Sequence, residues 1–127
     1  LGYWPHGTLV RDLLEISRHI DRWSLLGIPL IVFLRTPSND GPDRLASSES
    51  QVIELGAGQQ LTPDLQNARI QHLIPLLLSK ISVHGFVWNQ WSDATPHEYP
   101  HAGLIDADGK IKPAFQTLCE IRQNNLL

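Results

Sequence analysis

The sequence lacks most of the features that assign a protein to a class at first sight. Its 127 residues contain one cysteine, and the formal charge is only −3. A single cysteine excludes an internal disulfide bond, and so small a charge gives no sign of a nucleic-acid partner. No apolar run reaches the roughly 20 residues that span a membrane, and no signal-peptide pattern is present. We therefore expect neither a nucleic-acid nor a membrane partner.

The common catalytic motifs are missing as well. The chain has no G-x-S-x-G elbow, no Walker loop and no G-x-G-x-x-G, so esterase, nucleotide-hydrolysing and dinucleotide-binding functions lack support. Cys119 lies in an apolar helical pattern, which favours a small buried hydrophobic residue over a nucleophile. We expect no cofactor and assign no catalytic residue.

Methionine is absent, and the chain begins Leu1-Gly2-Tyr3-Trp4-Pro5, which is not a translation start. We therefore expect residues 1–127 to be a single partial domain of a longer protein. A site predicted from these residues is expected to be completed by others.

Apolar residues at helical spacing predict three amphipathic helices. Their expected ranges are 8–26, 62–80 and 113–125. Thr8 and Thr62 are the expected N-caps of the first two helices, and Pro113 opens the third. Pro75 lies inside the second helix and should kink it or separate its last turn.

Two uninterrupted apolar runs of strand length, Ile28–Leu34 and Val83–Trp88, each follow a helix. Continuous apolar runs are typical of strands that are buried on both faces, as in parallel sheets. The alternation of helices and strands therefore predicts an α/β fold with a parallel sheet. Two strands are too few for an independent sheet, which again indicates part of a larger α/β structure. The loop between them, residues 35–62, is long enough to carry function or to be poorly ordered.

Polar and aromatic residues directly follow the second predicted strand. Parallel α/β folds place their ligand sites at the carboxyl ends of strands. Aromatic rings beside hydrogen-bonding groups suit a sugar, because a ring covers its C–H face while polar groups bind its hydroxyls. The alternative is that the tryptophans only fill the core. The candidate substrate-binding residues are Trp88, Asn89, Gln90, Trp91 and Asp93, with Tyr3, Trp4 and His97 at the rim. For Asp93, orienting a neighbour or capping a turn is an equally open role.

The segment His97-Glu98-Tyr99-Pro100-His101 matches the HExxH zinc motif. That motif requires a helix that brings both histidines to one face. Pro100 would remove a helical hydrogen bond there, and no apolar helical pattern surrounds the segment. We interpret His97 and His101 as loop residues and expect no metal site.

The stretch Gly85–Asp93, followed by Gly103–Asp106, Gly109 and Lys112–Phe115, resembles the end of a family 10 glycoside hydrolase. That family contains the endo-1,4-β-xylanases and belongs to the clan of retaining (β/α)8 barrels. Asp21–Val32 likewise resembles the sixth helix leading into the seventh strand. The resemblance implies the C-terminal half of a TIM barrel: helix 6, strand 7, helix 7, strand 8 and helix 8. It also implies a xylan-like β-linked polysaccharide and the rest of the barrel as partners, and a secreted or periplasmic location.

The family's nucleophilic glutamate lies near the end of strand seven, and its acid/base glutamate lies on strand four. Here the corresponding run Phe33–Pro37 has no carboxylate, and strand four is not in the chain. Two hypotheses follow. The chain contributes a sugar platform to a glycoside hydrolase, or it belongs to a non-catalytic carbohydrate-binding or scaffold protein.

Overall fold

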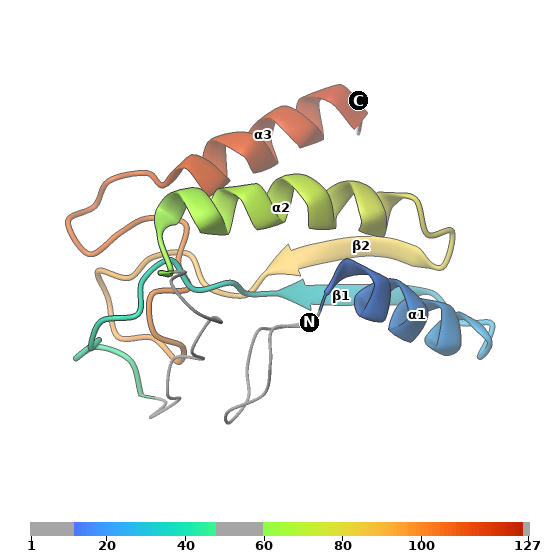
Figure 1. Ribbon diagram of the computed structural model, residues 1–127, viewed down its shortest axis with the longest axis horizontal. Coiled ribbons are helices and arrows are strands. Elements are labelled where there is room, and N and C mark those ends of the chain that lie inside the picture. The colour runs from blue at the N-terminus through green and yellow to red at the C-terminus, as the bar shows by residue number, and fades with distance from the viewer. Residues whose placement is uncertain (1–11, 48–59, 126–127) are drawn as a thin grey trace.

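The computed structural model describes residues 12–47 and 60–125. Its elements, in order, are α1 (Leu13–Ser24), β1 (Leu30–Leu34), α2 (Pro63–Leu78), β2 (Val83–Trp88) and α3 (Pro113–Asn125). The predicted α/β order is confirmed, and α2 lies along the sheet with α3 packed beside it (Figure 1). None of the helices in these two ranges is long and apolar enough to cross a membrane.

The two strands pair in parallel, as the sequence predicts. Val32 lies opposite Phe86, and Leu34 lies opposite Trp88. Val32 and Leu34 are buried in one core together with apolar residues from all three helices, and Phe86 packs against that core. The helices therefore cover one face of the sheet.

The opposite face of the sheet is largely exposed, so the expectation of strands buried on both faces is wrong for the described residues. Ile31, Phe33 and Val87 alternate with the core residues, and they are 55%, 56% and 45% exposed. The physical reason is the one-sided placement of the helices. Each strand also has one edge without a partner strand among the described residues.

Local signals in the sequence set most helix ends. Thr62 caps α2, its Oγ1 accepting from the Leu65 N–H at 3.1 Å, and Pro63 occupies the first turn. Asp12, whose Oδ1 accepts from the Glu15 N–H at 2.7 Å, caps α1. The first helix therefore begins at Leu13, later than predicted, and the expected cap Thr8 lies outside the described residues.

Pro75 does not split α2, which runs unbroken to Leu78. Proline removes the hydrogen bond to the carbonyl four residues earlier, here that of Gln71. Gln71 is exposed, so water can satisfy its carbonyl. The second option of the prediction, a separate last turn, is therefore wrong.

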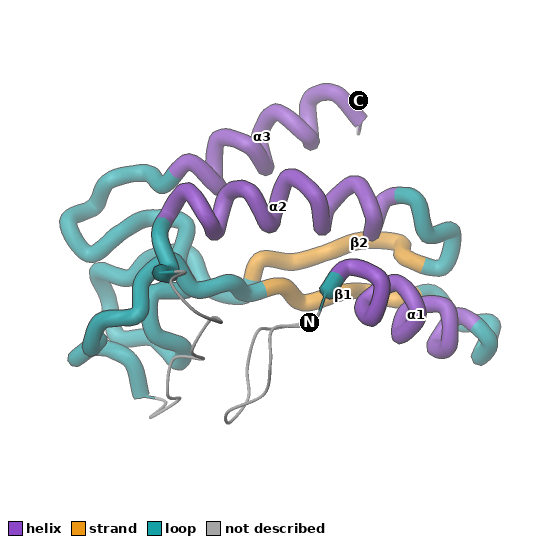
Figure 2. The backbone as a smooth tube through the Cα atoms, viewed as in Figure 1, coloured by secondary structure: helices purple, strands orange, loops and turns teal. Residues whose placement is uncertain are grey.

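Loops gather at the carboxyl ends of the two strands (Figure 2). The segment after β1 and the segment after β2 lie side by side there, since Ala46 forms a bridge with His97. Gln66 of α2 is fully buried and joins both segments, because its Nε2 donates to the Thr36 carbonyl at 2.6 Å and more weakly to the Gly103 carbonyl at 3.4 Å. The fold thus brings residues that are far apart in the sequence to one edge of the sheet.

Candidate functional site

A cavity of about 400 Å³ with a mixed polar and apolar lining lies in the segment that follows β2. It is lined by Asn89, Gln90, Trp91, Ser92, Thr95, Pro96, His97, Glu98 and Tyr99. We call this cavity the strand-end cleft. It occupies the carboxyl end of a parallel strand, the position at which the sequence predicts a ligand site.

Asp93 lies beneath the strand-end cleft and is almost completely buried. Its Oδ1 accepts from the Gly103 N–H at 2.7 Å, and its Oδ2 pairs with the Lys112 ammonium at 2.5 Å. Lys112 also donates to Ser38 Oγ at 2.8 Å. A Cβ at Gly103 would lie 2.6 Å from Asp93 Oδ1, so this close approach requires glycine. The structure therefore gives Asp93 the orienting role that the sequence left open.

Gln90 and Trp88 also hold the cleft together. Gln90 is 7% exposed, and its Nε2 donates to Asp93 Oδ1 while its Oε1 accepts from the Tyr99 N–H. The Trp88 indole N–H donates to the Ala102 carbonyl at 3.0 Å, and its ring packs against the core. Both side chains are engaged within the protein, so the core-filling alternative applies to Trp88.

Trp91 and Asn89 are the predicted sugar contacts that remain open to solvent. Trp91 is 61% exposed, and Phe115 supports it at right angles with ring centroids 5.4 Å apart. Asn89 continues the strand ladder through its N–H, which donates to the Leu34 carbonyl at 2.8 Å. Its exposed side chain forms no hydrogen bond with another described residue. The exposed part of the predicted site is thus one ring and one adjacent amide.

His97 lines the cleft but has no free ring nitrogen. Its Nε2 lies 2.8 Å from Asp43 Oδ2, and its Nδ1 lies 2.7 Å from the Thr95 carbonyl. Both partners are hydrogen-bond acceptors, so both contacts are satisfied together when both ring nitrogens carry a proton. A histidine held in this way positions a loop and does not act as a base toward a ligand.

Asp43 receives several donors besides His97. Burial opposes its ionisation, but hydrogen bonds from the His101 and Leu45 N–H groups and from His97 outweigh burial and lower the Asp43 pKa below its usual 3.8. The carboxylate is therefore held in its charged form.

The HExxH segment is not helical. His101 has a positive φ of 50°, and its ring Nε2 contacts the Gly41 carbonyl at 2.9 Å. The two histidines meet around Asp43 instead of forming the face of a helix. Within the ranges that the structure describes, no group of three histidine, cysteine or acidic side chains is arranged to hold a metal ion.

Tyr99 and Glu98 form the far wall of the cleft and Arg35 packs on Tyr99, a group that the sequence did not reveal. The Arg35 guanidinium lies 3.5 Å above the centre of the Tyr99 ring. A hydrogen bond to the Glu98 carboxylate, together with burial, raises the pKa of the Tyr99 hydroxyl above its usual 10.0, although Arg35 opposes the shift. Tyr99 therefore stays protonated. Glu98 is the acidic residue in the described lining, whereas glycoside cleavage requires a pair of carboxylates.

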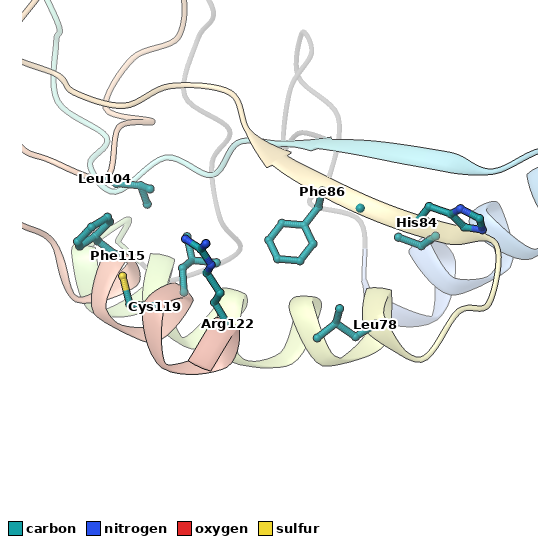
Figure 3. Close-up of a pocket in the computed structure, with 10 residues that line it drawn as sticks. Leu78, His84, Phe86, Leu104, Phe115, Cys119 and Arg122 are labelled. Atoms are coloured by element: carbon teal, nitrogen blue, oxygen red, sulfur yellow. The ribbon is translucent and has the colours of Figure 1, made fainter. Parts of the chain in front are cut away.

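A second cavity, of about 450 Å³, lies between β2, α2 and α3 (Figure 3). Phe86 and Leu78 face it from the strand and from α2, and Phe115, Cys119 and Arg122 face it from α3. It is mainly apolar and lies away from the strand ends. We call it the β2 groove. Its lining suits an apolar protein surface rather than a sugar.

Tyr3 and Trp4, predicted at the rim, lie outside the described residues. Asp43 and Arg35 were missed because they have no distinctive spacing in the sequence, and only the fold brings them to the cleft. Lys112 belongs to the Lys112–Phe115 stretch at the start of the last helix, and neither its type nor its spacing indicates the buried pair with Asp93.

Comparisons with family models, curated proteins and solved structures gave no match to this chain. The resemblance to family 10 glycoside hydrolases therefore rests on the residues quoted above.

Proposed function

We propose that the strand-end cleft binds a β-linked polysaccharide of the xylan type, with Trp91 as the platform for a sugar ring. The observation that carries this proposal is the 61% exposure of Trp91, a large ring held above a buried polar network. Trp91 also lines the strand-end cleft, and an exposed aromatic ring there can cover the C–H face of a sugar. Asn89, next to it, offers both a donor and an acceptor to sugar hydroxyls.

In this proposal the chain is the C-terminal half of a (β/α)8 barrel that resembles family 10 glycoside hydrolases. The exposed apolar sheet face, which includes Ile31 and Val87, would line the interior of the barrel. The unpaired edge of β2 and the β2 groove would lie against the next strand and its neighbours. One-sided cover by helices and a parallel pair of strands support this architecture.

The role of the whole barrel has two forms. As a glycoside hydrolase it would take its catalytic carboxylates from elsewhere, with this chain holding the glycan. As a non-catalytic carbohydrate-binding protein it would need no such pair. Two features favour the second form: the run Phe33–Pro37 at the end of β1 has no carboxylate, and Asp93 after β2 is buried in an ion pair. Release of reducing sugars from xylan by the longest available form of the protein would contradict the non-catalytic form.

The platform is tested by comparing Trp91→Ala with Trp23→Ala. Trp23 is a matched control, because it is 51% exposed but lies on α1. We expect Trp91→Ala to weaken xylohexaose binding, measured by isothermal titration, by roughly tenfold, since an aromatic contact and its buried area contribute about 1–2 kcal/mol. Trp23→Ala should leave the affinity unchanged. Equal affinity of both variants would contradict the proposal.

A further inference from the structure

Asp43 belongs to the loop after β1, yet it contacts the wall of the cleft that follows β2. The His97 and Asp43 side chains are 4% and 8% exposed, and their contact spans 54 positions of sequence. Backbone bonds reinforce it on both sides: the Ser47 N–H donates to the His97 carbonyl at 2.8 Å, and the His97 N–H donates to the Leu45 carbonyl at 3.1 Å. This pair is therefore one of several contacts that join the two loops, beside the bond from the Ser38 N–H to the His101 carbonyl at 3.0 Å.

His101 joins the same carboxylate. Its backbone N–H donates to Asp43 Oδ2 at 3.0 Å, and its ring Nδ1 lies 3.6 Å from that oxygen. The other ring nitrogen contacts the Gly41 carbonyl. The His97 ring thus has hydrogen-bond contacts to a carbonyl and to the carboxylate, whereas the His101 ring has one, to the Gly41 carbonyl. A neutral imidazole ring has a single N–H group and can donate to only one of its two acceptors. Its other nitrogen then places a lone pair against the lone pair of the second acceptor.

We propose that Asp43 is a positioning residue for the strand-end cleft, and that it holds the 95–101 wall in place most tightly when both ring nitrogens of His97 carry a proton. The wall carries His97, Glu98 and Tyr99 of the cleft lining. Loss of one ring proton from His97 removes one of these two hydrogen bonds and loosens the wall. The identity of the ligand depends on the function proposed above, whereas the positioning role of Asp43 does not.

The other charged groups near the two histidines are already engaged with partners. Lys112 faces the His101 carbonyl at 3.3 Å and is paired with Asp93. Glu98, beside His97 in the chain, is bonded to the Tyr99 hydroxyl. The pKa of Asp43 is lowered, so its contribution is present above 3.8 and is lost only as the pH falls through the lowered value.

The experiment is amide hydrogen exchange followed by NMR, at about pH 5.5 and about pH 8, the range in which histidine changes charge. The His101 amide reports its bond to Asp43, and the Ser47 amide reports the joined loops. After correction for intrinsic exchange, we expect protection of both amides to fall about tenfold at the higher pH, as for loss of a hydrogen bond to a charged group. Asp43→Asn should remove this dependence. Asp40→Asn, an exposed acid in the same loop, should keep it.

Equal protection at both pH values, or a pH dependence that persists in Asp43→Asn, would overturn the proposal. If Asp43→Asn does not fold, the ring nitrogen chemical shifts of wild-type His97 decide the question. Two protonated nitrogens at about pH 5.5 support the proposal, and a neutral ring at that pH overturns it. No glycan is used, so a failure here is separate from a failure of glycan binding, which the titration of Trp91→Ala would reveal.

Discussion

At the scale of single residues, the polar side chains after β2 divide into two groups with different roles. Asp93 and Gln90 face inward and are used within the protein, whereas Trp91 and Asn89 face solvent. The sequence predicted all four as sugar contacts, because residue type and position relative to a strand do not show which way a loop side chain points. Burial and hydrogen bonding separate them. The hydrogen bonds of Asp93 and Gln90 hold the loop that carries Trp91 and Asn89.

The buried Asp93–Lys112 pair gives a residue-scale prediction. Asp93→Asn leaves the Lys112 ammonium buried without its counter-charge, so we expect the free energy of unfolding in urea to fall by about 3–5 kcal/mol. Asp21→Asn breaks the pair with Lys80, in which the Asp21 side chain is 59% exposed, and should cost about 0–1 kcal/mol. Similar losses in the two variants would show that Asp93 does not hold the loops together.

At the scale of elements, the sequence predicted the starts of α2 and α3, because neighbouring residues determine where a helix begins. Thr62-Pro63 and Pro113 open their helices, and Gly109 makes the turn before α3 with a φ of 82°. The sequence could not show that one face of the sheet is exposed, because Ile31, Phe33 and Val87 on that face are as apolar as the residues that face the core. That distinction depends on which helices pack where, and it is a property of the fold rather than of a strand.

The exposed sheet face leads to an element-scale prediction. Ile31 and Val87 lie on that face, beside strand edges that lack partners among the described residues. Apolar strands of this kind promote association. We expect the isolated chain to self-associate with rising concentration in sedimentation velocity, and the double variant Ile31→Thr, Val87→Thr to shift it toward monomer.

Leu25→Thr is the control for this prediction, since Leu25 is 85% exposed but lies at the end of α1. It should not change the association. A wild-type chain that stays monomeric at every concentration would count against the half-barrel architecture.

At the scale of the whole molecule, the two parallel strands carry helices on one face and expose apolar residues on the other. Polar loops gather at the carboxyl ends of the strands. The α/β class and the location of the cleft followed from the order of the elements, because carboxyl ends of parallel strands meet at one edge. The far wall of the cleft could not be predicted from the order of the elements. Asp43 and Arg35 reach it through loop packing, and neither the spacing nor the type of these residues indicates a long-range contact.

The central claim is that the strand-end cleft binds a xylan-type glycan on Trp91. The most direct measurement is a titration of the ¹⁵N-labelled protein with xylohexaose, followed by NMR. The account predicts shifts of the Trp91 indole and the Asn89 side-chain amide that saturate together, while the indole of Trp23 on α1 stays in place. Unchanged Trp91 and Asn89 signals at saturating xylohexaose, or shifts confined to the β2 groove, would contradict it.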